Sequence, residues 1–512
     1  MTNETMKPFR PKYDLVLFVL LMVFLCASMV QKYTKIFHLK ALTGVFEPAP
    51  TPELSWQAYR STQWQQQLED YSSEHFGFRE PIVRIYNQYL WSAFRKTYCH
   101  YILPGRQNYL YYKSAVNDYY GKELLGHFKS NESALWYAET ELGRMNQLRQ
   151  VLKGYGIEFL AFIAPDKPVV YPEFLPRQDA DTTTLNMAEY YDCRLTEMGF
   201  PHINMTDWFV AMRDTVSFPL FLKTDSHWTY SAIYGFDSLF RFMNTLDGPD
   251  FPRLHIGPPV AYESDEMQGD ESVLNLLFRI RGDRVRYKSE ITVEADSTQR
   301  KPRVLFVGDS FVWSMRDYLP VRELMDDVEV WFYNNTAFVG YEFTKTDIKE
   351  IDALRHILNA DYVVFYAAGH QWREATFGFT KEALQLFDGV SEDDIMKAKR
   401  ISQIERDKDW LMALSMYAST NELPLEDVLV MEADNVKENK PLLREGVVVD
   451  SASFVQFKKD ELIRQWRSDP KQMRVIEEKA KERNLPFEVM LEKDAQWVIN
   501  YQIENGKLFP KQ

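Results

Sequence analysis

The chain has 512 residues, of which 45% are hydrophobic and 26% charged, a balance that excludes a wholly disordered, a collagen-like or a polytopic membrane protein. The formal net charge of −14 argues against bulk nucleic-acid binding, and three cysteines are too few for a disulfide framework or a four-cysteine zinc site. The length predicts about two to four domains.

An uncharged run, Leu15–Val30, lies close to the N-terminus. Together with Tyr13 and Tyr33 at its two ends it reaches the length of about 20 residues that spans a bilayer. Basic residues before the run place the N-terminus in the cytoplasm by the positive-inside rule. These residues are Lys7, Arg10 and Lys12.

A cleaved signal peptide is the alternative interpretation, because Cys26-Ala27-Ser28 has the small residues of a cleavage site. The length of the apolar run favours an uncleaved anchor. Either interpretation places the bulk of the chain outside the cytoplasm, in an oxidising space where Cys99 and Cys193 can pair if they lie close enough.

The chain divides into five predicted parts. In chain order these are a cytoplasmic tail (1–12), a transmembrane signal-anchor (13–33), a linker (34–55) that is rich in proline at 46–54, an α/β domain (56–388) and a helical C-terminal region (389–512).

The α/β domain opens with an aromatic, helix-like stretch over 56–98, interrupted at 75–79. Apolar runs then alternate with helical patterns, which predicts a mostly parallel sheet with helices on both faces. The expected strands are 157–164, 201–205, 304–307, 328–333 and 362–366, and the expected helices between them are 138–153, 183–198 and 346–358.

Beyond residue 390 the chain is charged and poor in glycine, and it repeats itself at an offset of 62 residues. The repetition predicts two copies of one helix–turn–helix unit. The matching residues are Asp407, Leu411, Ala418 and Leu423-Pro424-Leu425-Glu426 in the first copy, and Asp469, Met473, Ala480 and Leu485-Pro486-Phe487-Glu488 in the second.

The strongest candidate for chemistry is Gly308-Asp309-Ser310, which directly follows the apolar strand 304–307. Ligands bind at the carboxyl edge of open α/β sheets, and Ser310 would begin a helix whose free backbone N–H groups can stabilise an oxyanion. The simpler alternative is that Asp309 and Ser310 only cap a helix.

A serine nucleophile needs a base, and His227 is the candidate. It stands two residues after Asp225, and residues at i and i+2 of an extended segment point the same way, so Asp225 can orient the ring. A loop or helix cap is the alternative use of this pair. No further ligands are adjacent, so the sequence predicts no metal site.

Other residues near these motifs can support them. An oxyanion hole needs more donors than one N–H, and aromatic rings can stack on sugars, although turn formation and core packing are the simpler uses. The oxyanion or substrate candidates are Gly308, Asn334, Gly369, His370 and Gln371, and the stacking candidates are Trp228, Trp313, Tyr341 and Trp372.

Together, Gly308-Asp309-Ser310 and Asp225-x-His227 resemble the site of SGNH hydrolases, with Asp-x-His about 85 residues before Gly-Asp-Ser. That order is similar to the circularly permuted AlgX/AlgJ family of alginate-type polysaccharide O-acetyltransferases. Residues 75–79 resemble the family's FGFR element, and residues 164–176 resemble its P-x-K…YPE-x-LP stretch. The resemblance covers roughly residues 45–380.

The resemblance implies a flavodoxin-like SGNH acetyltransferase domain over 56–388, with Ser310, His227 and Asp225 as its catalytic triad. It implies transfer of acetyl groups to an exported or cell-surface polysaccharide through a serine acyl-enzyme. It also implies a membrane-bound O-acyltransferase partner that delivers the acetyl group, no cofactor, and an inner-membrane anchor with the bulk of the chain in a Gram-negative periplasm.

The sequence departs from the family in two places. No segment matches the Gly-x-Asn-Asp block of SGNH enzymes, and His370-Gln371 stands roughly where that block would be. The helical tail also differs from the β-rich carbohydrate-binding module of AlgX. Two other functions fit the same residues: an acetyl-esterase with the same triad, and a non-catalytic scaffold that binds the glycan and the acyltransferase.

Overall fold

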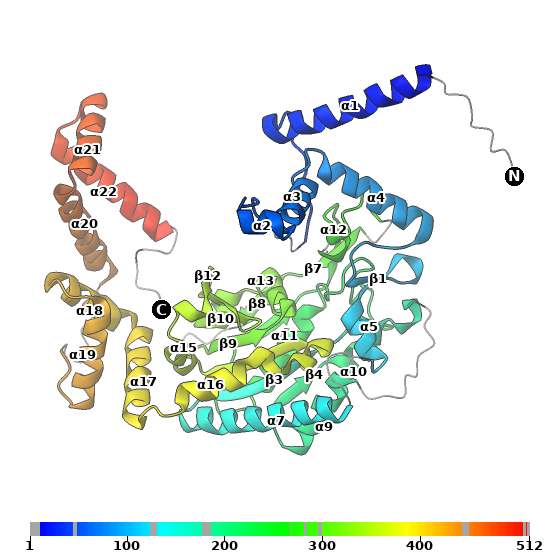
Figure 1. The fold of residues 1–512 in the computed structure, drawn as a ribbon. Helices are drawn as coiled ribbons and strands as arrows, with labels where there is room; N and C mark the ends of the chain where they lie inside the picture. Colours follow the sequence, from blue (N-terminus) through cyan, green and yellow to red (C-terminus); the bar gives the residue numbers. More distant parts are fainter. Residues whose placement is uncertain are drawn as a thin grey trace, which may run out of the picture.

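The structure is a computed structural model that describes residues 11–44, 49–122, 131–176, 186–267, 269–280, 284–294, 300–442, 450–504 and 508. Most of the expected cytoplasmic tail (1–10) and part of the proline-rich linker (45–48) lie outside the described residues. Figure 1 shows the sheet domain with an N-terminal group of helices at one end and a column of C-terminal helices at the other.

A seven-stranded sheet forms the centre of the fold, in the order β12-β11-β10-β9-β13-β3-β4. Strands β10, β9, β13, β3 and β4 run parallel, and β11 and β12 add an antiparallel edge. The predicted mostly parallel α/β sheet is confirmed. The strands are β3 (Glu158–Ala164), β4 (His202–Asn204), β9 (Arg303–Gly308), β10 (Asp327–Phe332), β11 (Thr336–Val339), β12 (Thr344–Asp347) and β13 (Tyr362–Ala368).

The central strands are apolar along their whole length because both of their faces are covered. Every residue of β3, β9 and β13 is buried. In β3, Leu160 and Phe162 enter one hydrophobic core, and Phe159 and Ala161 enter the other. Successive side chains of a strand point to opposite faces of the sheet, and here both faces are buried. Such strands therefore have continuous apolar sequences.

Helices cover both faces of the sheet. One core is closed by α10 (Thr206–Met212), α11 (Ala232–Met243), α13 (Ser314–Tyr318) and α14 (Val321–Leu324). The other is closed by α7 (Asn131–Gly154), α9 (Met187–Glu197), α15 (Ala353–Asn359) and α16 (Phe379–Phe387).

The helix predicted over 346–358 is wrong in its first half. Residues 344–347 form β12, which pairs antiparallel with β11, and a short 3-10 turn, η4 (Ile348–Glu350), leads into α15. The β-branched Thr344 and Thr346 fit a strand, and the pairing with β11 is a tertiary contact that a local helical pattern does not reveal.

Shorter elements complete the domain. Two antiparallel ribbons, β5–β8 and β6–β7, are inserted between α11 and β9 and enclose α12. The insertion comprises β5 (Arg253–Ile256), β6 (Val260–Glu263), α12 (Gly269–Val273), β7 (Val285–Lys288) and β8 (Ile291–Glu294). The others are β1 (Ile102–Pro104), η1 (Arg106–Asn108), β2 (Leu110–Tyr112), α5 (Lys113–Tyr119), α8 (Lys167–Val170), η2 (Pro172–Phe174), η3 (Ser310–Trp313) and η5 (Gly369–Gly378).

The N-terminal helices are α1 (Pro11–Thr34), α2 (Trp56–Arg60), α3 (Gln63–Glu74) and α4 (Arg79–Phe94). Among the described residues, only the segment Leu15–Thr34 of α1 is long and apolar enough to cross a membrane. The interruption predicted at 75–79 falls between α3 and α4. Cys26, Cys99 and Cys193 are free, so the pairing considered for the last two is absent from this structure.

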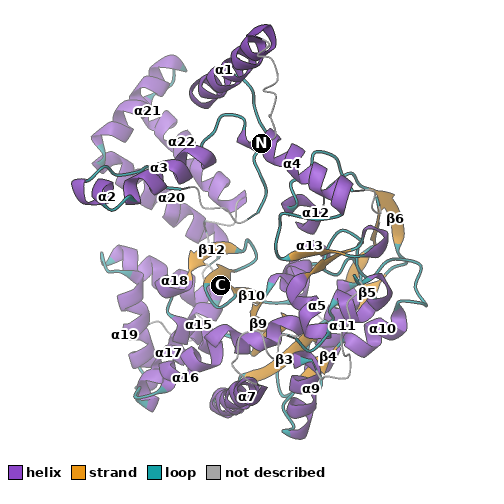
Figure 2. Ribbon diagram, turned by 45° about the vertical axis from the view of Figure 1, so that its right-hand side comes forward, coloured by secondary structure: helices purple, strands orange, loops and turns teal. Residues whose placement is uncertain are grey.

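The C-terminal helices repeat in space as they do in sequence, and each copy has three helices where the sequence indicated two. Figure 2 shows helices alone in this part of the chain. The pairs at an offset of 62 are α18 and α21, and α19 and α22, with α17 and α20 preceding them. Their bounds are α17 (Glu392–Arg406), α18 (Lys408–Thr420), α19 (Leu425–Lys437), α20 (Ser451–Ser468), α21 (Pro470–Glu482) and α22 (Phe487–Glu504).

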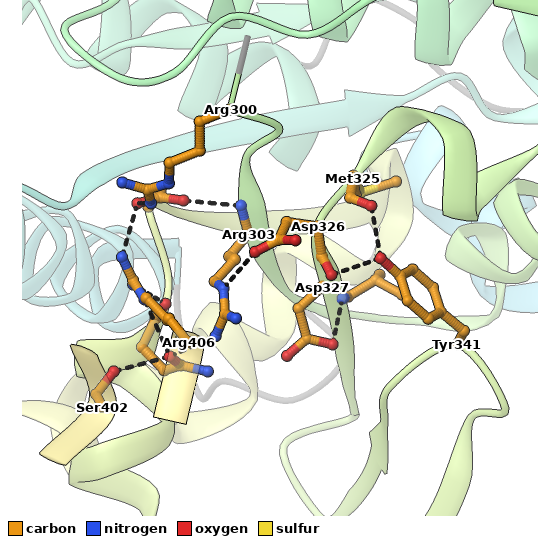
Figure 3. A network of polar contacts seen from close by, with 11 residues as sticks. Arg300, Arg303, Met325, Asp326, Asp327, Tyr341, Ser402 and Arg406 are labelled. Carbon is orange, nitrogen blue, oxygen red and sulfur yellow. Dashed lines mark hydrogen bonds and ion pairs between the residues drawn. The ribbon is translucent and has the colours of Figure 1, made fainter. Parts of the chain in front are cut away.

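A polar network fastens the first repeat to the amino ends of the parallel strands (Figure 3). The side-chain oxygen of Asn359 accepts hydrogen bonds from Arg303 at the start of β9 (2.8 Å) and from Ser402 of α17 (2.7 Å). Arg406 of α17 bonds the same oxygen (3.2 Å) and pairs with Asp361 (3.4 Å). The helical region therefore docks at the edge opposite to the one where β9 and β13 end.

Equivalent aspartates cap equivalent helices in the two repeats. The Asp407 carboxylate accepts the N–H of Trp410 (3.0 Å), and the Asp469 carboxylate accepts the N–H of Lys471 (2.9 Å). We expect Asp407→Ala and Asp469→Ala each to destabilise their own helix by about 1 kcal/mol, because each exposes an N-terminal backbone donor.

Hydrogen exchange of the first turns of α18 and α21 measures this effect. Glu477→Ala, on an exposed position of α21, is the control and should leave exchange in both helices unchanged. Equal protection in the capped and uncapped proteins would show that the caps contribute nothing.

Candidate active site

Ser310 stands where β9 ends at the carboxyl edge of the sheet. A Cβ atom at Gly308 would lie 2.0 Å from the carbonyl oxygen of Tyr366 in β13, so only glycine lets the two strand ends approach this closely. The chain then turns, and Ser310 begins η3 (Ser310–Trp313). The serine is only partly buried and is open to a reactant.

The fold brings His227 to Ser310 across 83 residues of sequence. The ring atom Nε2 lies 2.6 Å from Ser310 Oγ, and Nδ1 lies 2.8 Å from Oδ1 of Asp225. The same Asp225 oxygen accepts the backbone N–H of His227 (3.0 Å), which fixes the turn between the two residues. The three predicted residues thus form a continuous serine–imidazole–carboxylate chain of hydrogen bonds.

The electrostatics favour a charged pair of Asp225 and His227. Burial disfavours the carboxylate of Asp225, but the charge and hydrogen bonds of His227 outweigh it and lower the pKa of Asp225. Burial likewise disfavours a protonated His227, but Asp225, with help from Asp270 and Asp309, raises its pKa to about 9. At neutral pH the free enzyme therefore holds the ring mostly protonated, and a neutral base forms as the pH rises.

A buried ammonium group holds the loop that carries Asp225. Lys167, 1% exposed, donates to the carbonyl oxygens of Leu222 (2.6 Å), Lys223 (2.9 Å) and Asp225 (2.8 Å), and also to that of Leu110 in β2 (2.7 Å). The sequence offered a signal in Pro165-Asp166-Lys167 at the end of β3, but it did not show which carbonyls the lysine would reach.

The segment around α12 supports the same loop from the other side. Gly269 donates its N–H to Oδ2 of Asp225 (3.3 Å), and Glu271 donates its N–H to the carbonyl of Thr224 (3.1 Å). The hydroxyl of Ser226 donates to Asp270 (2.5 Å), whose pKa is raised to about 6 by burial and by the neighbouring charge of Asp225. None of these contacts was predicted from the sequence.

Asp309 has a structural task of its own. Its carboxylate accepts the N–H of Phe311 (2.9 Å) and that of Ala368 at the end of β13 (2.8 Å). Burial raises the pKa of this group. The helix-capping interpretation is therefore right for Asp309, and the cap orients the turn that presents Ser310.

Tyr333, which the sequence analysis missed, lies against the serine. The Tyr333 hydroxyl lies close enough to Ser310 for the serine to influence its pKa, which burial raises, so the phenol stays protonated. Tyr333 and Asn334 have left-handed backbone angles (φ 50° and 49°), a strained geometry that clusters at functional sites. The only sequence signal was its place directly after β10.

The other oxyanion candidates are engaged elsewhere. The Asn334 side chain donates to Glu382 (2.7 Å). His370 binds Asp166 through both its backbone N–H (2.6 Å) and its Nδ1 (2.7 Å), and Gln371 lies beside that ring. These bonds hold η5 to the end of β3. The lack of a side chain at Gly369 lets the backbone of η5 approach the Asp166 carboxylate closely. Gly308 allows the close packing of β9 and β13 described above.

The structure shows how the four residues predicted to stack on sugars are packed. Trp228 and Trp372, 4% and 1% exposed, pack inside the two cores and offer no ring face to a sugar. Trp313 packs edge-on against Phe338 (4.7 Å between ring centroids) and beneath Arg316. Tyr341 donates to the carbonyl of Met325 (2.7 Å) at the opposite end of the sheet (Figure 3).

A cavity of about 210 Å³ opens beside His227. The ribbon β6–β7 and α13 form its far wall. It is smaller than the roughly 300–1,000 Å³ of typical ligand pockets, so it suits a single small group of a larger molecule. Among its lining residues are Tyr262, Glu266, Arg286, Tyr287, Asp317 and Tyr318.

Within the described part of the chain, no three histidine, cysteine, aspartate or glutamate side chains are grouped to hold a metal ion.

Comparisons with known proteins find a family model that matches part of this chain. Residues 117–234, which include Asp225 and His227, match the family model "SGNH hydrolase-like domain, acetyltransferase AlgX". No curated protein matches the chain.

Three solved structures are similar. The O-acetyltransferase domain of Pseudomonas putida AlgJ has 17% identity and a TM-score of 0.35, with 58% of this chain and 98% of that one covered. Pseudomonas aeruginosa AlgX has 13% identity and a TM-score of 0.35, covering 55% and 67%. Bacillus cereus PatB1 with a sulfonyl adduct has 12% identity and a TM-score of 0.33, covering 47% and 92%.

The pKa of His227 gives a pH prediction for the nucleophile. A sulfonyl fluoride should modify Ser310 faster as the pH rises through about 9, because only the neutral ring can accept the serine proton. Asp225→Asn removes the carboxylate that raises this pKa. We expect it to move the inflection toward the ordinary histidine value of about 6.5 and to slow modification by about 10²-fold or more.

Mass spectrometry of the modified peptide measures the rate at each pH. Asp317→Asn removes a carboxylate from the same cavity without touching His227 and should keep the wild-type inflection. An unchanged inflection in Asp225→Asn, or modification that persists in Ser310→Ala, would contradict the assignment.

Proposed function

We propose that this chain transfers acetyl groups to hydroxyls of an exported or cell-surface polysaccharide through an acyl-enzyme on Ser310, and the match of residues 117–234 to the AlgX acetyltransferase model supports this proposal. The observation that carries the proposal is the hydrogen-bonded chain from Ser310 through His227 to Asp225.

In the first half-reaction, His227 Nε2 accepts the proton of Ser310 as Oγ attacks the carbonyl carbon of an acetyl ester. We expect the oxyanion that forms to be stabilised by the backbone N–H of Ser310 and by the nearby Tyr333 hydroxyl, which is protonated at neutral pH and can donate. The bond to the leaving group then breaks, the leaving group takes the proton from His227, and acetyl-Ser310 remains.

In the second half-reaction, a sugar hydroxyl replaces the leaving group. His227 accepts its proton, the sugar oxygen attacks the acetyl carbonyl, and Ser310 leaves and regains a proton from His227. Transfer outcompetes hydrolysis only if the acceptor excludes water from the ester. Tyrosine rings and acidic side chains around the cavity beside His227 suit a hydroxyl-rich acceptor.

The proposal includes a location and a partner. Leu15–Thr34 anchors the chain in the inner membrane, with the catalytic domain in the periplasm. The acetyl donor is then supplied by a membrane-bound O-acyltransferase, since acetyl donors are made in the cytoplasm, and the chain needs no cofactor of its own. The composition of α1 and the family of the domain support this arrangement.

Acetyl transfer by the detergent-solubilised full chain tests the proposal. We expect acetylated glycan from an acetyl-ester donor and a surface glycan, and a loss of at least about 10³-fold in Ser310→Ala, because the nucleophile is gone. Ser238→Ala, whose hydroxyl bonds within helix α11, should retain full activity.

Two results would redirect the assignment. Acetate release that depends on Ser310 but not on the glycan would identify an esterase. Transfer that survives in Ser310→Ala would remove the triad from the mechanism.

Tyr333→Phe tests the oxyanion contact. We expect transfer to slow by about 10²-fold, as for the loss of one oxyanion donor, while the pH inflection stays near that of the wild type. Tyr341→Phe is the matched control, because its hydroxyl binds carbonyls at the opposite end of the sheet. Rates measured at saturating donor distinguish the two variants, and equal rates would exclude a role for Tyr333.

A further inference from the structure

Helix α4 is apolar on two opposite faces. One face packs inward, where Trp91 contacts a small core that contains Leu274 and Leu276. The opposite face is open to solvent although it is hydrophobic. Its residues are Ile82 (40% exposed), Ile85 (56%), Tyr86 (51%) and Tyr89 (58%).

Further exposed apolar side chains lie on the segment after α12, which borders α4. Gln88 accepts the N–H of Phe278 (2.9 Å), and Asn87 donates to the carbonyl of Leu274 (2.9 Å), so this segment lies beside α4. Leu277 and Phe278 are 47% and 68% exposed. We call Ile82, Ile85, Tyr86, Tyr89, Leu277 and Phe278 the α4 face. Exposed apolar side chains are ordinary singly, but a contiguous group marks a contact surface.

The α4 face is tethered close to the end of α1. Thr43 and Asn275 exchange two hydrogen bonds (2.8 and 2.9 Å), which fix the chain beside α4 nine residues after α1 ends at Thr34. Nine extended residues reach at most about 30 Å. The start of α4 is closer still, because the ring of Phe78, its N-cap, lies 6.2 Å from that of Phe37, three residues after α1 ends.

The composition around the α4 face is that of a membrane interface. Residues 79–96 carry four basic residues against one acidic residue, Glu80, in a chain whose net charge is −14. Arg84 and Arg95 donate to groups of the protein itself, and Arg79 and Lys96 stand at the two ends of α4. Aromatic rings sit at the headgroup level of bilayers, and basic side chains bind anionic headgroups.

We propose that the α4 face seats on the surface of the anionic bilayer that Leu15–Thr34 crosses, with α4 lying in the interface as an amphipathic helix. The inference rests on the proposed membrane span. It has a consequence for the site, because the segment 269–280 that carries Phe278 also bonds Asp225 through Gly269. The triad is thereby held near the membrane, where an acetyl donor carried by a membrane protein would arrive.

Lipid-borne photolabelling of the full chain tests the proposal. The protein is reconstituted alone in vesicles of phosphatidylcholine and phosphatidylglycerol with a carbene-generating probe in the acyl chains. We expect label in α1 and in the peptides 79–98 and 274–280. Peptides that contain Trp136 (69% exposed) and Trp497 (67% exposed) are internal controls, because they are equally exposed but distant in sequence, and they should stay unlabelled.

A variant with Ile85→Ser, Tyr89→Ser and Phe278→Ser should reduce label in 79–98 and 274–280 to the level of the Trp136 peptide while α1 keeps its label. If α1 is labelled and the α4 face of the wild type is not, the proposal is overturned and the membrane span stands. If neither is labelled, both fail. Protection of the face only when a second membrane protein is added would assign it to a protein partner and overturn the bilayer assignment.

Discussion

The arrangement of the site depends on one buried cation. The ammonium group of Lys167 is held by four carbonyl oxygens, three of them from the loop that carries Asp225. A buried charge is costly unless it is fully hydrogen-bonded, so the loop has little freedom to move away from it. Since Lys167 follows β3 and Ser310 follows β9, the lysine fixes the His227 loop relative to the sheet on which the serine stands.

The sheet separates two tasks between its two edges. The carboxyl ends of β9 and β13 carry Ser310 and the backbone around it, and the cavity beside His227 opens there. At the amino ends of the same strands, Asp361 pairs with Arg406 of α17, and Arg303 is linked to that helix through Asn359. Attaching the repeats at that edge leaves the edge that carries Ser310 uncovered by them.

The inserted segment connects the N-terminal helices to the loop that carries Asp225. Residues 269–280 bond Asp225 on one side and Thr43, Asn87 and Gln88 on the other. The function proposed above requires Ser310 to lie within reach of an acetyl donor carried by a membrane protein. The segment 269–280 contacts both α4, which we propose to lie on the membrane, and Asp225, which orients His227. The position of the N-terminal anchor and the geometry of His227 are therefore physically connected.

The sequence by itself determined the mostly parallel sheet, because β3, β9 and β13 are buried on both faces and therefore read as unbroken apolar runs. It also predicted the set of three residues that the structure joins by hydrogen bonds, since Ser310 directly follows a strand and Asp225 stands two residues from His227, both of which are local patterns. The repeat at an offset of 62 was visible because equivalent caps and core positions need the same residue types.

Only the tertiary structure decided the rest, because those features depend on contacts between distant segments. Lys167 and Asp270 contact the loop of Asp225, which is far from both of them in sequence. Tyr333 lies near Ser310 because the strands β9 and β10 are neighbours in the sheet. The antiparallel strand at 344–347 exists through its pairing with β11. Burial removed Trp228 and Trp372 from the surface, since an aromatic residue next to a motif packs into a core as readily as it faces a ligand.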